Sequence, residues 1–269
     1  MYKFSDQKEG KETVFTIKNQ DLKFGVGALR ELWSDAKTLE MKRIALFLDS
    51  NIRASNPIGV ILESSQSTGL EINIYDEVVC EPNTTSCMAA ADFVKQGDYD
   101  GIVSIGGGSV MDTAKAANLL SCHGGRILDY VNAPIGLAKK IPGRLLPHIA
   151  CPTTSGTGAE TTGIVVLDIE EIGLKSGISS PYLKPDHAIV DPETTLTLPS
   201  GVIASTGFDV LTHAVESYVA RPFTSSDRPS NPSLRMGYQG ATPYNDIGAL
   251  AAIRIGGKYL LRAVNEDQD

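Results

Sequence analysis

The chain has 269 residues, of which 42% are hydrophobic and 21% charged, a composition that favours a folded globular protein over disordered, collagen-like and membrane classes. This length is enough for one large domain or two ordinary ones. The 24 basic and 32 acidic residues give a net charge of −8 at pH 7, which opposes binding to nucleic acid or to an anionic membrane surface. We therefore expect a small-molecule ligand, with no nucleic-acid and no membrane partner.

The amino-terminal residues 1–15 are polar and mixed in charge, without the apolar core of a secretory signal or the Arg-rich pattern of a transit peptide. No apolar run approaches the roughly 20 residues of a membrane-spanning helix. The cysteines have neither a C-x-x-C pair nor framework spacing, which is typical of reduced thiols. These are Cys80, Cys87, Cys122 and Cys151. The sequence thus predicts a soluble, cytoplasmic protein without disulfides.

Short apolar runs alternate with segments of helical periodicity over most of the chain. Strands are expected within residues 42–50, 71–78, 102–105, 145–154 and 187–192, and helices at 57–68, at 84–96 and from about 109. This order predicts an α/β fold with a parallel or mostly parallel, Rossmann-like sheet and helices on both faces.

The pattern changes near Pro199, where strand patterns cease and residues 200–220 acquire helical spacing. A polar stretch rich in Pro, Ser and Arg follows at 221–244, and helical spacing then resumes. We place a domain boundary here, with an α/β domain over 1–198 and the start of an all-α domain over 199–269. Because each helix has to bury its apolar stripe, we expect cover from a second subunit, as in a homodimer, or from further chain.

The segment IGGGSVMD, residues 105–112, places three glycines and a serine between a buried strand and a helix. Glycine permits close backbone approach, and the exposed N–H groups together with the helix dipole attract phosphate. A dinucleotide pyrophosphate would fit there. The segment is not a G-x-G-x-x-G motif, so a tight strand-to-helix turn is the alternative interpretation.

Two further segments follow expected strands. Asp49 could accept both ribose hydroxyls of adenosine and repel a 2′-phosphate, which would select NAD over NADP; alternatively it is an ordinary loop residue or helix cap. The run CPTTSGTGAETT, residues 151–162, carries hydroxyls and glycines that suit hydrogen bonds to a ribose, a phosphate or an amide. Such clusters are also common in plain loops.

Asp209 and His213 are spaced i, i+4, so that on a helix they share one face. A carboxylate oxygen and an imidazole nitrogen suit iron or zinc. Two ligands do not complete a catalytic site, and a polar helix face is the alternative. The other histidines, His123, His148 and His187, have no spacing relation to this pair, and we expect structural roles for them.

The segments GGGSVMDTAKA, PTTSGTGAE, and DPETTLTLP followed by ASTGFDVLTHAVESY resemble the iron-containing alcohol dehydrogenase family. The resemblance implies an amino-terminal NAD-binding domain, an all-helical carboxyl-terminal domain and a divalent metal, iron or alternatively zinc, in the cleft between them. The implied cofactor-binding residues are Asp49, Gly106, Gly107, Gly108, Ser109, Asp112, Thr153, Thr154, Thr157 and Lys175. The first two implied metal ligands are Asp209 and His213. The remaining two are histidines on later helices, and no such segment precedes Asp269, so we expect a truncated chain.

Residues 221–247 and DYVNAPIG, residues 129–136, resemble the hydroxyacid-oxoacid transhydrogenase branch of this family. That branch implies oxidation of 4-hydroxybutyrate, with 2-oxoglutarate as hydride acceptor through a retained nicotinamide cofactor. Arg235 could bind the anionic substrate, or be a solvated surface residue.

Two other functions remain open at this point. One is a lyase or cyclase resembling the dehydroquinate synthases, and the other is a catalytically silent NAD-binding fragment.

Overall fold

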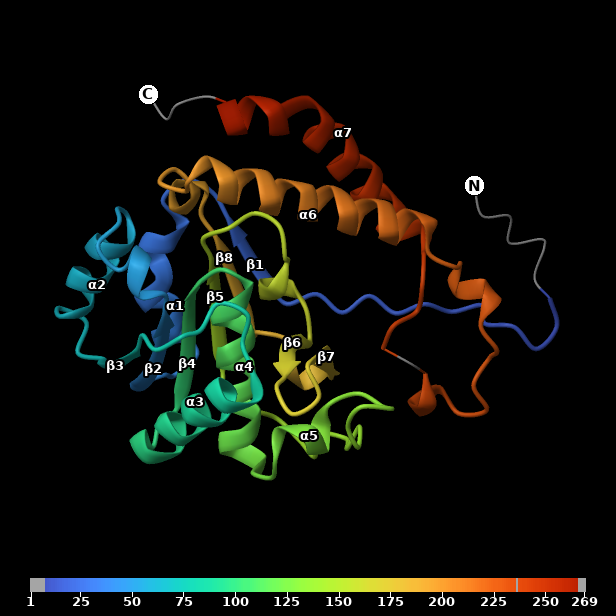
Figure 1. Cartoon of the computed structure of the whole chain (residues 1–269), viewed down its shortest axis with the longest axis horizontal. Helices are drawn as coiled ribbons and strands as arrows, with labels where there is room; N and C mark the ends of the chain where they lie inside the picture. The colour runs from blue at the N-terminus through green and yellow to red at the C-terminus, as the bar shows by residue number, and fades with distance from the viewer. Residues whose placement is uncertain (1–7, 236, 266–269) are drawn as a thin grey trace. The chain divides into compact units, whose positions relative to one another are not determined.

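The computed structural model describes residues 8–235 and 237–265, which divide into two compact units (Figure 1). One unit consists of Asn19–Thr154 and Gly158–Thr197 and is called the sheet unit below. The other combines the described residues up to Lys18, the short loop Ser155–Thr157 and the described residues from Leu198 onwards, and is called the helical unit.

A six-stranded sheet forms the centre of the sheet unit, with the strand order β1-β8-β5-β4-β2-β3. Every neighbouring pair is parallel. In that order the strands are Asp21–Phe24, His187–Val190, His148–Pro152, Gly101–Gly106, Arg43–Leu48 and Glu71–Tyr75. The predicted α/β fold with a mostly parallel sheet is therefore confirmed.

Helices cover both faces of this sheet, which explains the continuous apolar run of β2. Its residues Ile44, Leu46 and Leu48 pack on one face with α1 (Leu32–Thr38) and α2 (Ile58–Ser65). Its residues Ala45 and Phe47 pack on the other face with α3 (Thr84–Gly97) and α4 (Gly108–His123). A strand buried on both sides has no polar alternation, as expected for a parallel sheet.

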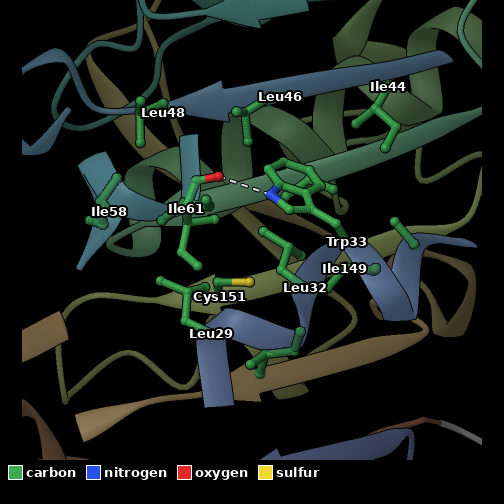
Figure 2. Packing of buried hydrophobic residues seen from close by; sticks show 14 of the residues in the cluster. Leu29, Leu32, Trp33, Ile44, Leu46, Leu48, Ile58, Ile61, Ile149 and Cys151 are labelled. Carbon is green, nitrogen blue, oxygen red and sulfur yellow. Dashed lines mark hydrogen bonds between the residues drawn. The ribbon is translucent and has the colours of Figure 1, made fainter. Parts of the chain in front are cut away.

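Figure 2 shows the first of these cores, in which Trp33 of α1 lies among aliphatic side chains. The Trp33 indole N–H donates a hydrogen bond of 2.9 Å to the carbonyl oxygen of Ile61 in α2. This bond satisfies the one polar atom that the indole brings into the core.

Several elements were absent from the predicted pattern. They are β1, α1, α5 (Ile127–Tyr130) and an antiparallel hairpin of β6 (Ile164–Ile169) and β7 (Leu174–Ser179). β1 has only four residues and is mostly exposed at the sheet edge, so it shows no apolar run. It becomes a strand by pairing with β8, more than 160 residues later in the chain (Asp21↔His187).

Short 3₁₀ helices connect the larger elements. They are η2 (Ala28–Glu31), η3 (Ser50–Ile52), η4 (Ala159–Thr161), η5 (Pro181–Leu183), η6 (Pro192–Thr195), η7 (Phe223–Ser225) and η8 (Pro232–Leu234).

Two long helices, α6 (Ser200–Val219) and α7 (Pro243–Asn265), pack side by side in the helical unit (Figure 1). Glycines allow the close approach: a Cβ on Gly256 would lie 2.6 Å from Leu211, and one on Gly207 would overlap Leu260. Many large apolar side chains of this pair remain exposed, among them Phe208 and Ile247. Cover of these side chains by a second subunit or by further chain stays a prediction. The assignment of cofactor binding to residues 1–198 and of metal binding to residues 199–269 also stays a prediction.

Within the part of the chain that the structure describes, no helix is both long and apolar enough to cross a membrane.

Candidate functional site

The candidate cofactor site lies where β2 and β4 end. These neighbouring strands are followed by α2 and α4, which cover opposite faces of the sheet. In open parallel sheets, ligands bind at such a switch point, outside the carboxyl ends of the strands. Leu48 pairs with Ile105, so Asp49 and Gly106 follow on adjacent strands. The structure thus brings Asp49 and the glycine segment to one edge.

The glycines allow β4 to turn directly into α4. A Cβ on Gly106 would overlap the side chain of Val110, and one on Gly107 would lie 3.4 Å from the Thr154 hydroxyl. Gly107 is the N-cap of α4, and no side chain caps this helix end. The first N–H groups of a helix lack partners within the helix, so this end of α4 suits a phosphate.

The end of β5 is tied to the same segment. The Thr153 N–H donates a hydrogen bond of 3.0 Å to the Gly106 carbonyl oxygen, and Thr154 lies beside Gly107. Thr153 is buried and Thr154 half-buried. Thr157 belongs to the helical unit, where its side chain is exposed.

A residue that sequence reasoning missed, Glu81, connects two predicted cofactor residues. Its N–H donates a hydrogen bond of 3.2 Å to the Ser109 hydroxyl, and its carboxylate lies 3.1 Å from the Lys175 ammonium. The hydrogen bond to Glu81 raises the pKa of Lys175, so the lysine is charged. Glu81 has a φ of 58°, in the left-handed region. The neighbouring sequence gives no signal that predicts this conformation.

Asp49 also serves its own loop. Its carboxylate accepts hydrogen bonds of 2.9 Å from the backbone N–H and from the side-chain amide of Asn51. It thereby caps η3. The structure thus shows Asp49 as the N-cap of η3, and its binding to a ribose stays a prediction.

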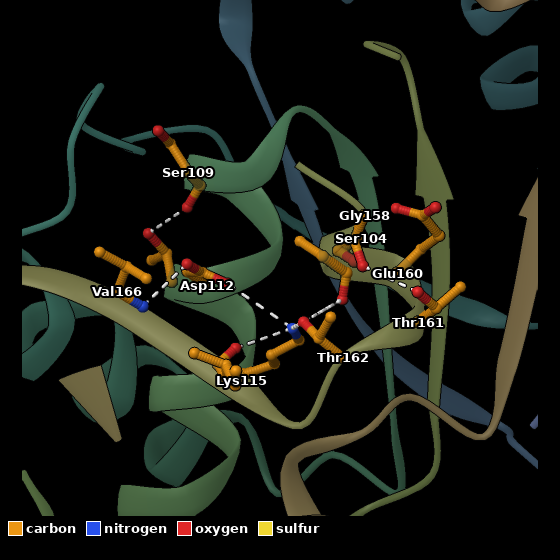
Figure 3. A network of polar contacts seen from close by, with 12 residues as sticks. Ser104, Ser109, Asp112, Lys115, Gly158, Glu160, Thr161, Thr162 and Val166 are labelled. Atoms are coloured by element: carbon orange, nitrogen blue, oxygen red, sulfur yellow. Dashed lines mark hydrogen bonds and ion pairs between the residues drawn. The ribbon is translucent and has the colours of Figure 1, made fainter. Parts of the chain in front are cut away.

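Asp112 points into the protein, where it forms a buried network with Lys115 (Figure 3). Its carboxylate accepts a 2.9 Å hydrogen bond from the Val166 N–H and lies 3.6 Å from the Lys115 ammonium. Lys115 donates to the carbonyl oxygens of Ala159, at 2.7 Å, and Ile164, at 2.9 Å. Burial raises the pKa of Asp112 and lowers that of Lys115. Direct cofactor binding by Asp112 stays a prediction; this geometry favours positioning of α4.

The candidate metal ligands lie on α6. The Asp209 Oδ1 and His213 Nε2 atoms are 3.7 Å apart, and the other ring nitrogen of His213, Nδ1, lies 3.2 Å from the Gly156 carbonyl oxygen. Among residues 8–235 and 237–265, no three His, Cys, Asp or Glu side chains are arranged to hold a metal ion together. The described residues therefore provide two adjacent atoms that could bind a metal, the Asp209 carboxylate oxygen and the His213 ring nitrogen.

A pocket of about 360 Å³ lies within the helical unit, beside one of these donors. Its walls come from the amino-terminal segment, one face of α6, residues 237–240 and the start of α7. The lining side chains are mostly polar or small: Phe15, Thr16, Ile17, His213, Glu216, Ser217, Ala220, Tyr238, Gln239, Thr242 and Asn245.

Arg235, suggested as a partner for the substrate or as a solvated surface residue, is paired with an acidic residue. Its guanidinium donates hydrogen bonds of 2.8 and 3.2 Å to the two carboxylate oxygens of Glu12. The hydrogen bond from Arg235 lowers the pKa of Glu12 to about 2. Arg235 is already paired and largely buried, so it is neither a solvated surface residue nor a free partner for a substrate carboxylate.

An open parallel sheet with a glycine-rich turn at its switch point defines the class as a nucleotide-binding-type α/β fold. The sequence model of the family described as iron-containing alcohol dehydrogenase matches residues 19–192, and the chain belongs to that family. The predicted family is confirmed.

The chain is also similar to individual named proteins. It is 44% identical to the mitochondrial hydroxyacid-oxoacid transhydrogenase of Rattus norvegicus over 264 residues, which cover 97% of this chain and 56% of the relative. The Homo sapiens enzyme is 43% identical over the same shares of both chains. The sulfoacetaldehyde reductase of Bifidobacterium kashiwanohense, solved in complex with NAD⁺, superposes with a TM-score of 0.80 at 28% identity, covering 95% of this chain and 62% of that one. The chain spans about half the length of the curated relatives it matches.

The predicted cytoplasmic location is wrong. The relatives of this chain among the transhydrogenases are mitochondrial proteins. The prediction depended on patterns missing from residues 1–15, and a missing pattern does not by itself specify a compartment.

Proposed function

We propose that this chain carries the NAD-binding site and two metal ligands of an oxidoreductase that transfers hydride between an alcohol or hydroxyacid and NAD. One observation carries the proposal: Asp49, the Gly106–Ser109 segment and Thr154 meet at the switch point of the sheet. Membership in an oxidoreductase family supports the reaction class, and it argues against the lyase or cyclase alternative.

The residues at this edge have separable roles in holding the cofactor. The N–H groups of Gly107, Gly108 and Ser109 would bind the pyrophosphate at the uncapped start of α4. Asp49 would accept hydrogen bonds from the adenosine ribose and disfavour a 2′-phosphate. Lys175, held near Ser109 through Glu81, would add a positive charge.

Asp209 and His213 fit a divalent metal, because their facing donor atoms are a carboxylate oxygen and an imidazole nitrogen. We propose iron, with zinc as the alternative that the same donors accommodate. When bound, the metal would supply Lewis acidity toward the substrate oxygen, and the nicotinamide would supply the hydride acceptor. The chain's own residues bind and orient these groups, and no side-chain nucleophile is needed.

The substrate we propose is a small hydroxyacid, with 4-hydroxybutyrate as donor and 2-oxoglutarate as final acceptor, in the mitochondrion. The similarity to mitochondrial hydroxyacid-oxoacid transhydrogenases supports this choice. The pocket beside His213 is within the size range of small-molecule sites.

The cofactor role is tested by titrating NAD and NADP into the chain in a calorimeter. We expect tighter binding of NAD, and we expect Asp49→Ser to reduce the preference for NAD by about tenfold, equivalent to the loss of about 1.4 kcal/mol. Asp21→Ser is the matched control, since this exposed residue begins β1 at the opposite edge of the sheet. An unchanged preference in Asp49→Ser would refute the assignment.

The reaction is tested by following NADH absorbance with 4-hydroxybutyrate, with and without 2-oxoglutarate. Turnover that depends on an added divalent metal supports an enzyme. NAD binding without any turnover or metal uptake would favour the silent NAD-binding fragment instead.

A further inference from the structure

We infer that Gly156 is a positioning residue for His213: its carbonyl oxygen fixes which ring nitrogen carries the proton, and so directs the other nitrogen toward Asp209. The inference rests on the proposed metal role of His213. All three residues belong to the helical unit.

The first support is the geometry of the imidazole. The His213 Nδ1 atom lies 3.2 Å from the Gly156 carbonyl oxygen. A carbonyl oxygen only accepts hydrogen bonds, so Nδ1 is the nitrogen that carries the proton. The Asp209 carboxylate also only accepts, but its Oδ1 lies 3.7 Å from Nε2, which is beyond hydrogen-bond distance. In a neutral imidazole with the proton on Nδ1, the lone pair is on Nε2.

The second support is that only glycine fits at position 156, next to α6. A Cβ on residue 156 would lie 2.7 Å from the Thr206 carbonyl oxygen and 3.0 Å from the Thr206 Cβ. Two of the three nearest atoms are backbone atoms of α6, and a side chain cannot displace them without moving the helix. Any side chain at position 156 would therefore push the carbonyl away from α6 and from His213.

These two observations have one chemical consequence. A metal binds the imidazole lone pair, and ligating histidines commonly donate their other N–H to a backbone carbonyl, which sets the tautomer and the ring orientation. Loss of such a partner typically weakens metal binding by about 10–100-fold. The Ser155–Thr157 loop would thus prepare the metal ligand before any metal binds.

The inference is tested on the whole chain, labelled with ¹⁵N-histidine, by long-range ¹H–¹⁵N NMR at about pH 8, where free imidazole is neutral. His213→Gln identifies the His213 signals among the four histidines. We expect Nδ1 protonated and Nε2 unprotonated in the wild-type chain. In Gly156→Ala we expect a shift toward the other tautomer, with circular dichroism confirming the fold.

The matched control is Gly201→Ala, because a Cβ at this α6 position meets no atom within 4 Å. It should keep the wild-type tautomer. Zn²⁺ titration followed on the Nε2 signal should show binding at least tenfold weaker in Gly156→Ala, with Gly201→Ala unchanged.

Two results would overturn the inference. The first is an unprotonated Nδ1 in the wild-type chain, a measurement that does not depend on the folding of any variant. The second is an unchanged tautomer in Gly156→Ala. The proposed function fails separately, if His213→Gln leaves the Zn²⁺ affinity of the chain unaltered. In that case the tautomer measurement still decides whether Gly156 orients the ring.

Discussion

Replacing Lys115 by Met tests whether the buried network of Figure 3 holds α4 to the segment that follows β5. The Lys115 side chain is fully buried, and its ammonium donates to two carbonyl oxygens and faces Asp112. Methionine keeps most of the apolar stem but removes the charge and the donors. Asp112 then remains as a buried carboxylate without a cation.

The expected cost follows from these contacts. Removing one partner of a buried ion pair typically costs about 3–5 kcal/mol, because the other charge stays buried without compensation. The two hydrogen bonds from Lys115 to the Ala159 and Ile164 carbonyl oxygens are lost as well and add to this cost. For a protein of this size, about 4 kcal/mol corresponds to a decrease of roughly 10 °C in Tm.

Urea denaturation followed by circular dichroism measures the change. Lys95→Met is the matched control, because Lys95 is an exposed residue of α3 whose ion pair with Asp92 spans 3.9 Å; we expect a change within about 0.5 kcal/mol there. Combining Lys115→Met with Asp112→Asn should cost less than the sum of the single changes. If Lys115→Met is within about 1 kcal/mol of wild type, the reasoning is refuted.

Three further predictions concern other buried groups. Burial lowers the pKa of His148 from 6.5 to about 3. Between these pH values the His148 imidazole is protonated only in the unfolded chain, so the free energy of unfolding falls by up to about 1.4 kcal/mol per pH unit below about pH 6.5. Urea titrations at several pH values should show a weaker pH dependence in His148→Gln. An unchanged slope of unfolding free energy against pH would contradict the assignment. Trp33→Phe removes the indole hydrogen bond to the Ile61 carbonyl oxygen, which keeps the hydrogen bond from the Ser64 hydroxyl, so we expect a loss of about 0.5–1.5 kcal/mol. Unfolding of this variant is followed by circular dichroism, because the chain has one tryptophan and the variant has no tryptophan fluorescence. An unchanged free energy of unfolding would show that the hydrogen bond is dispensable. Arg235→Met should lower Tm and raise the pKa of Glu12 from about 2, but it should leave 4-hydroxybutyrate affinity unaltered; a large loss of affinity would restore Arg235 as a substrate residue.

The sequence by itself determined the features that depend on local pattern. The apolar run of β2 predicted a buried strand, and both of its faces are buried; the alternating order of strands and helices predicted the parallel sheet. The glycines before α4 and the i, i+4 spacing of Asp209 and His213 are local as well. A helix places such a pair on one face whatever surrounds it, and the order of the motifs identified the family.

Only the tertiary structure decided which distant groups meet. β1 is a strand because β8 lies beside it, and Arg235 is paired because residues near the amino terminus bring Glu12 to it. The Lys115 network and the contact between Gly156 and His213 likewise join segments far apart in sequence. Periodicity records which face of a segment is buried. It does not record which partner covers that face, because the partner is selected by packing and hydrogen bonding across the whole fold.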